Sequence, residues 1–130
     1  MSDRLVINNL SHDFGDHTVL NQINLSLGNS EFLAILGPSG CGKSTLLRAI
    51  AGLIETQAGN IQLQDMVFNR DGKIITPAEK RRVGFVFQDY ALFPFLTVKD
   101  NIAFELKTKH HSFSKQEIEH RTHELLALIG

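Results

Sequence analysis

Short segments of the chain show the pattern of β-strands, and in two of them apolar and polar residues alternate. Ile23, Leu25 and Leu27, for example, are separated by single polar residues. This period of two gives a strand one buried face and one solvent-facing side, which is typical of antiparallel sheets. The two alternating segments are 23–27 and 61–64, and further strands are predicted at 5–10 and in the short segment 73–75.

Two further segments, 32–36 and 83–87, differ because apolar residues fill almost every position. A strand without a polar face is typical of a parallel sheet that is covered on both sides. The first of these segments ends directly before Gly37. We therefore predict a buried parallel strand at 32–36 and another apolar strand at 83–87.

Three helices are predicted, one after Gly42 and two near the end of the chain. Thr97 can cap the second helix, and Ser114 with Glu117 forms a capping box for the third, because hydroxyl and carboxylate can each satisfy a free amide. The complete order of elements predicts a mixed α/β domain. The first helix carries apolar residues at the spacing of one face, namely Leu46, Leu47, Ile50, Ala51 and Ile54.

Composition excludes some classes of protein. The 130 residues suffice for one small domain, and 42% apolar residues is normal for a globular chain. A net charge of −1 gives no indication of a nucleic-acid partner. One cysteine, Cys41, cannot form an internal disulfide, which fits the cytoplasm. The first residues include no apolar segment of signal-peptide length, and no apolar run approaches the length that spans a bilayer. We therefore expect that a role in a membrane process would require docking onto an embedded partner.

A glycine-rich loop matches the phosphate-binding pattern G-x-x-x-x-G-K-[ST] at every fixed position. Glycines let backbone amides approach phosphate oxygens closely, and the N-terminus of the following helix favours an anion. A chance match in a turn is the alternative, but the strand before and the helix after supply the context that the motif requires. The predicted phosphate-binding residues are Gly37, Pro38, Ser39, Gly40, Cys41, Gly42, Lys43, Ser44 and Thr45.

Side chains of this loop have predicted roles toward ATP and Mg²⁺. Lys43 would bridge the β- and γ-phosphates, and the Ser44 hydroxyl would ligate the nucleotide-bound Mg²⁺. Thr45 would hydrogen-bond the α-phosphate. Cys41 is interpreted as a small filler within the loop, with a reactive thiol as the alternative.

The residues around the loop narrow the class of protein. Residues 37–52 read GPSGCGKSTLLRAIAG, residues 58–61 read AGNI, and residues 86–94 read VFQDYALFP. Together they resemble the nucleotide-binding subunits of bacterial ATP-binding cassette (ABC) importers, over essentially the whole chain. The resemblance implies the phosphate-loop (P-loop) nucleoside triphosphate hydrolase fold, with an antiparallel β subdomain and an incomplete parallel core sheet. A small kinase, as an alternative, would lack the match at 86–94.

The resemblance implies two further site residues. Phe14 matches an aromatic residue that stacks on adenine, although the family usually has Tyr or Trp there; a core or strand-end Phe is the alternative. Gln88 matches a glutamine that contacts Mg²⁺ and the attacking water, since its amide can both accept and donate. A surface loop glutamine is its alternative. Lys43 and Gln88 are thus the predicted catalytic residues, and Ser44 and Gln88 the predicted Mg²⁺ ligands.

The resemblance also implies partners. The segment Tyr90–Val98 corresponds to the groove that receives a short helix of the membrane-embedded permease subunits, with ordinary core packing as the alternative. A second copy of the ATPase subunit and a periplasmic solute-binding protein complete such a system. The implied location is peripheral, on the cytoplasmic face of the inner membrane.

Within the family, residues 76–106 look most like ferric iron importers, and polyamine, sulfate, maltose or phosphonate importers are the alternatives. Iron suggests a metal role for some of the six histidines. His110 and His111 are adjacent, whereas His120 and His123 would share one helix face. No familiar metal-binding spacing includes them. We therefore predict solvated surface histidines.

The family's signature sequence, catalytic glutamate and switch histidine do not occur in the 130 residues. The resemblance thus implies that residues 1–130 are the N-terminal part of one nucleotide-binding domain, and that they lack hydrolytic activity alone. A truncated, non-hydrolytic nucleotide-binding or interaction module is the alternative. We also expect this polypeptide to be poorly stable, because the strand beside 32–36 is expected from the absent half.

Overall fold

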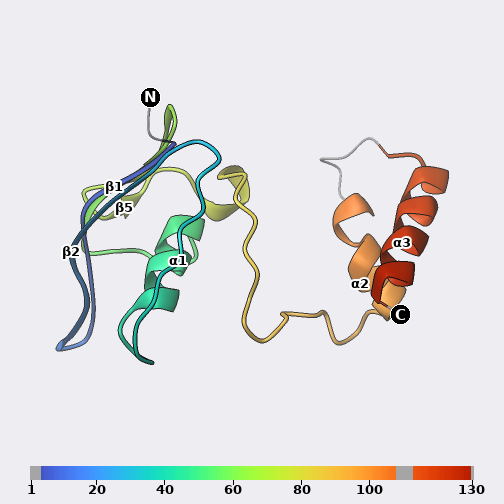
Figure 1. Ribbon diagram of the computed structural model, residues 1–130, viewed down its shortest axis with the longest axis horizontal. Coiled ribbons are helices and arrows are strands. Elements are labelled where there is room, and N and C mark those ends of the chain that lie inside the picture. Colours follow the sequence, from blue (N-terminus) through green and yellow to red (C-terminus); the bar gives the residue numbers. More distant parts are fainter. Residues whose placement is uncertain (1–3, 108–112, 130) are drawn as a thin grey trace. The chain divides into compact units, whose positions relative to one another are not determined.

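The computed structural model describes residues 4–107 and 113–129. The chain divides into two compact units, Met1–Phe85 and Val86–Gly130. The first unit contains an antiparallel sheet and a helix, and the second contains helices (Figure 1). Each unit has its own internal packing, and each is described separately below.

The first unit is built on a five-stranded sheet in the order β2-β1-β3-β4-β5, with every neighbouring pair antiparallel. Its two long strands, β1 and β2, form a hairpin that closes at Phe14 and His17. The antiparallel subdomain predicted from the sequence is therefore confirmed, although β4 was missed. The strands are β1 (Leu5–Phe14), β2 (His17–Leu27), β3 (Ala58–Leu63), β4 (Met66–Arg70) and β5 (Lys73–Ile74).

One helix of this unit, α1 (Lys43–Ala51), lies beside the sheet (Figure 1). Leu46 and Ala49 point from α1 into the cluster of buried side chains that the strands supply. Leu47, predicted on the buried face, is 46% exposed, and Ile54 lies beyond the end of the helix. The buried cluster consists of Leu5, Ile7, Leu10, Leu20, Leu46, Ala49, Ile61 and Phe68.

The two predicted buried strands, 32–36 and 83–87, are not strands in the structure. Phe32 is 94% exposed, Leu36 is 90% exposed and Val86 is 94% exposed. A strand is stabilised by a ladder of hydrogen bonds to neighbouring strands, and among the described residues neither segment belongs to the five-stranded sheet. The prediction of a buried strand at 32–36 is wrong for this structure, as is the strand at 83–87.

A short 3₁₀ turn, Ala78–Lys80, ends the ordered elements of the first unit. The second unit contains α2 (Val98–Ala103), a 3₁₀ turn at Glu105–Lys107, and α3 (Lys115–Ile129). The helices α2 and α3 pack against each other. Two terminal helices were predicted from the sequence, and both are confirmed.

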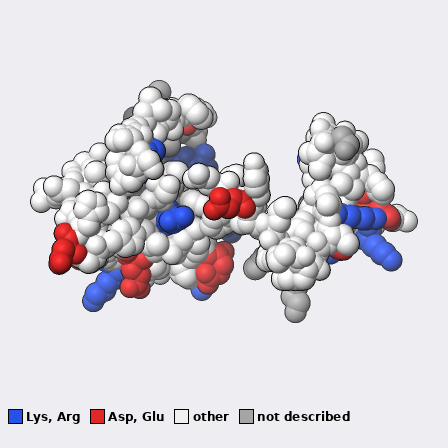
Figure 2. Space-filling view, turned by 90° about the horizontal axis from the view of Figure 1, so that it is seen from below, with Lys and Arg blue, Asp and Glu red and all other residues white. Residues whose placement is uncertain are grey.

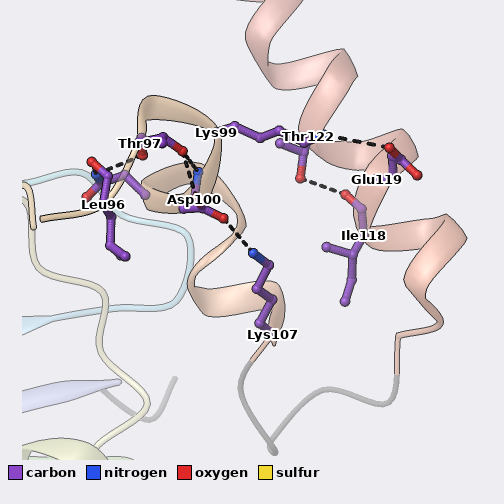
Figure 3. Close-up of polar contacts among 9 residues, drawn as sticks. Leu96, Thr97, Lys99, Asp100, Lys107, Ile118, Glu119 and Thr122 are labelled. Atoms are coloured by element: carbon purple, nitrogen blue, oxygen red, sulfur yellow. Dashed lines mark hydrogen bonds and ion pairs between the residues drawn. The ribbon is translucent and has the colours of Figure 1, made fainter.

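Both helices begin with the predicted caps. Thr97 Oγ1 accepts a hydrogen bond from the amide of Asp100 at 3.1 Å, and it donates to the Asp100 carboxylate at 2.7 Å (Figure 3). At α3, the Ser114 amide donates to the Glu117 carboxylate at 2.7 Å, and the Glu117 amide donates to Ser114 Oγ at 3.3 Å. These reciprocal bonds satisfy amides that the first helical turn leaves free.

Two ion pairs also connect elements of the second unit. Lys99 Nζ on α2 lies 3.6 Å from Glu119 Oε1 on α3, whereas Lys107 Nζ in the 3₁₀ turn lies 2.8 Å from Asp100 Oδ1 on α2 (Figure 3). All four side chains are about half exposed. Exposed ion pairs contribute little free energy, so the packing of α2 on α3 is the larger contribution.

Candidate functional site

The glycine-rich loop passes close to the sheet just before α1 begins. Gly42, the residue before α1, has φ of 97° and is buried. A Cβ atom at this position would lie 2.6 Å from the backbone oxygen of Val19 in β2. Only glycine combines this φ with so close an approach to another backbone. The start of α1 is thereby fixed against β2.

The first turn of α1 carries no side-chain cap among the described residues. Gly42 has no side chain with which to accept a hydrogen bond, and no acidic residue lies in the first turn. The amide groups at this end therefore retain their positive partial charge and their capacity to donate. A helix start of this kind can bind an anion such as a phosphate group.

The ammonium group of Lys43 points into the loop. Its Nζ donates to the carbonyl oxygens of Gly37 at 2.8 Å and Pro38 at 2.6 Å, and it lies 3.6 Å from Cys41 Sγ. The lysine thus brings a positive charge to the same place as the free amides of the helix start. This geometry agrees with the phosphate role predicted for Lys43, although the role itself stays a prediction.

The other side chains of the loop differ in their exposure. The Ser44 side chain is exposed at the first turn of α1, whereas Thr45 is buried. Cys41 is an exposed free thiol, and a Cβ atom on Gly37 would lie 2.8 Å from its sulfur. The Cys41 side chain therefore occupies the space inside the loop beside Gly37, which fits its interpretation as a filler.

Phe14 lies at the end of β1 and is 55% exposed. The imidazole of His12 packs edge-on against its ring, with ring centroids 4.6 Å apart and an interplanar angle of 87°. His12 itself is buried, and neither of its ring nitrogens has a hydrogen-bond partner among the residues that the structure describes. One face of an exposed aromatic ring can stack on a base. The adenine role of Phe14 remains a prediction.

Arg81 is a deeply buried charged residue beside the C-terminal end of α1, and it was not predicted from the sequence. Its side chain is 1% exposed, and its guanidinium lies over the Phe68 ring at 4.8 Å. Arg81 donates to the backbone oxygens of Ala49 and Ile50, at the last turn of α1, at 2.8 and 2.9 Å. No local sequence pattern marked it, because Arg81 lies within a run of three basic residues.

Three more bonds connect Arg81 to the strand and loop beside the helix. It donates to the backbone oxygens of Thr76 at 2.7 Å and Phe68 at 3.3 Å, and to Asn69 Oδ1 at 2.8 Å. No carboxylate pairs with Arg81 among the residues that the structure describes. Burial lowers the pKa of Arg81 from its ordinary value, because loss of water disfavours the charged form.

Gln88 and the segment Tyr90–Val98 belong to the second unit. Gln88 is exposed and lies outside any helix or strand. Asn101 on α2 binds the loop between Gln88 and α2. Its side-chain oxygen accepts from the Phe93 amide at 2.9 Å, and its side-chain nitrogen donates to the Phe93 oxygen at 3.2 Å. A pocket of about 290 Å³ lies here, lined by Tyr90, Ala91, Leu92, Phe93, Asn101, Ile102, Phe104 and Glu105. The roles of Gln88 and Tyr90–Val98 stay predictions.

Charged groups of both signs are interspersed on the face shown in Figure 2, and neither sign forms an extended patch there. Within the described residues, no three His, Cys, Asp or Glu side chains gather in a way that could hold a metal ion. His120 is exposed and lies 3.5 Å from Glu124, and His123 is also exposed. His110 and His111 lie outside the described residues. None of the described helices is both long and apolar enough to span a bilayer.

Comparison with known sequences covers nearly all of the chain. The profile of the ABC transporter family matches residues 20–130. A sulfate/thiosulfate import ATP-binding protein of Pectobacterium atrosepticum is 48% identical over 125 residues, which are 95% of this chain and 36% of that protein. A spermidine/putrescine import ATP-binding protein of Thermotoga maritima is 50% identical over 125 residues, 95% and 32% of the two chains. The chain thus spans about a third of these curated relatives.

Comparison with solved structures gives a consistent result. The dimeric structure of a bacterial ABC transporter cassette is similar with a TM-score of 0.77 and 29% identity, covering 95% of this chain and 56% of that one. A dimeric post-hydrolysis state of the same cassette, bound to ADP and phosphate, has a TM-score of 0.76 with the same identity and coverage.

Proposed function

Because this chain belongs to the ABC transporter family and has the fold of the N-terminal portion of its ATPase cassettes, we propose that it forms the phosphate-binding part of an importer's ATP-binding subunit. We also propose that residues 1–130 are the N-terminal part of one nucleotide-binding domain. One observation carries the proposal. The uncapped start of α1 and the ammonium of Lys43 lie together at the glycine-rich loop.

The residues present fit a nucleotide polyphosphate. Backbone amides of residues 40–45 donate to phosphate oxygens, and Lys43 exchanges its carbonyl partners for the β- and γ-phosphates. Each bond from Lys43 to a neutral carbonyl is then replaced by a bond to an anionic phosphate oxygen, so that donor and acceptor are both ionised and attract each other more strongly. Thr45 donates to the α-phosphate, and the Phe14 ring receives adenine on its exposed face.

Magnesium accompanies the nucleotide in this proposal. Hard oxygen donors suit Mg²⁺, and the exposed Ser44 hydroxyl at the first turn of α1 is such a donor. The amide oxygen of Gln88 is the second proposed ligand. When bound, the metal ion neutralises charge that develops on the phosphates. Gln88 also orients the attacking water, so that Gln88 and Lys43 are the residues of this chain that act in ATP hydrolysis.

The proposed partners follow from the same family. The pocket beside Tyr90–Val98 has a mostly apolar lining and receives a segment of the membrane-embedded permease. A second copy of the subunit completes the ATP site, as the dimeric cassette supports. A periplasmic solute-binding protein delivers the solute. The protein is then peripheral, on the cytoplasmic face of the inner membrane.

The relatives that the comparison names indicate which solutes the importer takes up. The ferric iron predicted from the sequence has no support among the named relatives, which import sulfate/thiosulfate or spermidine/putrescine. We propose one of these two classes of solute. Uptake of labelled sulfate and labelled spermidine, with and without the gene in its intact operon, distinguishes them, and uptake of iron alone would restore the earlier prediction.

ATP titration tests the proposal at the loop. Lys43→Ala removes the central cation, and we expect the affinity for Mg²⁺-ATP to fall by a factor on the order of 100 in calorimetry, as for loss of a buried charge-assisted bond. Lys80→Ala, which changes an exposed lysine outside the loop, is the control and should leave the affinity unchanged. Unchanged affinity in the Lys43 variant would contradict the assignment.

Hydrolysis separates the proposed enzyme from the alternative of a non-hydrolytic module. The full chain that the gene encodes should release phosphate from ATP in the presence of Mg²⁺, and Gln88→Ala should slow this release more than it weakens ATP binding. ATP binding with no phosphate release by that full chain would favour the non-hydrolytic module.

A further inference from the structure

Arg81 fastens the end of α1 that is remote from the phosphate loop. Its guanidinium donates to the carbonyls of Ala49 and Ile50, in the last turn of the helix, and to Phe68 and Asn69 of β4. The carbonyl oxygens at a helix C-terminus lack partners within the helix and carry a partial negative charge. The Ala49 oxygen also accepts from the Gly52 amide at 3.1 Å. Arg81 adds a second bond to this oxygen, donates to the Ile50 oxygen and ties both carbonyls to the sheet.

The residues around Arg81 pack closely against its guanidinium. Gly52, directly after α1, has φ of 79°, and a Cβ atom there would lie 2.6 Å from Arg81 Nε and 2.7 Å from Cζ. The Phe68 ring packs against the guanidinium at 4.8 Å. With its five bonds to Thr76, Ala49, Ile50, Phe68 and Asn69, the guanidinium is held in one orientation.

Stability alone is a weak reason for this arrangement. A buried charge without a counter-charge loses its hydration, and apolar residues of similar volume often stabilise a core better than buried ions do. A guanidinium fixes the directions of its hydrogen bonds, because its N–H donors lie in one rigid plane. A lysine or an apolar side chain cannot bind the same set of carbonyls at once.

We propose that Arg81 is a positioning residue for the phosphate loop, acting through α1. The start of α1 is fixed where Gly42 meets Val19 of β2, and its end is fixed by Arg81. The nine residues of α1 span roughly 13 Å, so a shift at the end that Arg81 holds is transmitted along the helix to the phosphate loop. The inference rests on the proposed function, in which the amides at the start of α1 bind phosphate.

Substitution of Arg81 in the full chain that the gene encodes tests this role. We expect Arg81→Met to weaken binding of Mg²⁺-ATP about tenfold, and Arg81→Lys to weaken it less, when both are measured by calorimetry at a temperature where circular dichroism shows them folded. Thr56→Ala is the matched control, because it removes a buried hydrogen bond to Gly72 without a bond to α1. It should lower the melting temperature and leave the affinity for ATP unchanged.

Gly52→Ala provides a second variant that retains the arginine. Its methyl group would displace the guanidinium from α1, so the affinity for ATP should fall in the same direction. This variant and Arg81→Lys decide the question if Arg81→Met does not fold. The proposal is overturned if the folded Arg81 and Gly52 variants bind ATP within about twofold of the unchanged protein, which lies below the smallest coupling usually resolved.

The nuclear magnetic resonance shifts of the Gly42 and Ser44 amides give a readout that needs no nucleotide. In Arg81→Lys these amides should shift, whereas in Thr56→Ala they should not. If the unchanged protein fails to bind ATP, the proposed function fails, and the amide shifts still test whether Arg81 positions the loop. Unchanged amide shifts in Arg81→Lys would overturn the positioning role even if ATP binds.

Discussion

Gly42 and Gly40 both have positive φ angles, 97° and 81°, but their surroundings differ. A Cβ atom on Gly42 would lie 2.6 Å from the Val19 backbone oxygen, whereas a Cβ atom on Gly40 has no neighbour within 4 Å. We expect Gly40→Ala to lower the free energy of unfolding by about 1 kcal/mol, the cost of the left-handed conformation. Gly42→Ala should lower it by about 3 kcal/mol or more, because a backbone must move.

Urea unfolding of the two glycine variants measures this difference. The pair isolates the contact with β2 from the backbone conformation, since both variants adopt a positive φ. Equal losses in the two variants would show that the approach of the loop to Val19 is not tight in solution.

Asn69 offers a test of the buried Arg81 network. Its Oδ1 accepts from Arg81 at 2.8 Å, while its Nδ2 is buried and has no hydrogen-bond partner within residues 4–107 and 113–129. Asn69→Asp removes the unpaired donor and gives Arg81 a counter-charge. We expect the free energy of unfolding to rise by about 1 kcal/mol near neutral pH, the gain of a charged over a neutral hydrogen bond less the desolvation of the new carboxylate.

The same substitution at Asn29 is the matched control for Asn69. Asn29 accepts from Arg4 at 3.3 Å, and both residues are exposed. Asn29→Asp should therefore change the free energy of unfolding by less than about 0.5 kcal/mol in the same urea titration. A loss of stability in Asn69→Asp would mean that desolvation of the new carboxylate exceeds its attraction to Arg81.

Single residues were predictable where a motif fixes their spacing. The phosphate loop located Lys43, and the structure directs its ammonium into that loop. Arg81 was not predictable, because Lys80, Arg81 and Arg82 are chemically similar neighbours. Only the fold selects among them: Lys80 ends a 3₁₀ turn and is exposed, and Arg82 is exposed with φ of 52°. Which basic residue turns inward depends on carbonyls from β4 and α1, which are distant in sequence.

Among the elements, the starts of α2 and α3 depend on ionised carboxylates. Hydrogen bonds from Lys107 and Thr97 lower the pKa of Asp100, and hydrogen bonds from Ser114 lower the pKa of Glu117. A carboxylate with a lowered pKa in the folded state contributes stability above its unfolded pKa, which is about 4 for these groups. This contribution is lost as the pH falls through the folded-state pKa.

We therefore expect the first turns of α2 and α3 to loosen on acidification. Exchange of the Asp100 and Glu117 amides, followed from about pH 6 to about pH 3 and corrected for intrinsic rates, should become faster relative to the middle of α3. Asp100→Asn and Glu117→Gln should remove this pH dependence at their own helix. Protection that stays constant across the acid range would contradict the role of the ionised caps.

Elements were predictable where their signal is local. The capping pairs at Thr97 and Ser114 lie within four residues of their partners, and both helices are present as predicted. The segments 32–36 and 83–87 carry equally clear apolar patterns but form no strand. The pattern identifies residues that favour burial in a sheet, whereas a strand requires a neighbour that local sequence does not contain.

At the scale of the whole molecule, large apolar side chains remain exposed in segments 32–36 and 83–87, which form no strand. Phe32, Leu36 and Val86 each expose at least 90% of their surface. Apolar surface in contact with water has a high free energy, and exposed apolar segments outside a sheet can associate with other chains. A polypeptide limited to residues 1–130 should therefore associate with copies of itself.

Light scattering of a purified polypeptide of residues 1–130 tests this expectation at low micromolar concentration. The double variant Phe32→Lys and Val86→Lys places charges on both exposed segments, which should reduce the scattering because like charges repel and lysine opposes strand pairing. Met66→Lys, at an apolar residue of β4 that is 39% exposed, is the control and should not. A monomer with a cooperative thermal transition well above room temperature would contradict the expectation, because segments 32–36 and 83–87 would then be buried within a single chain.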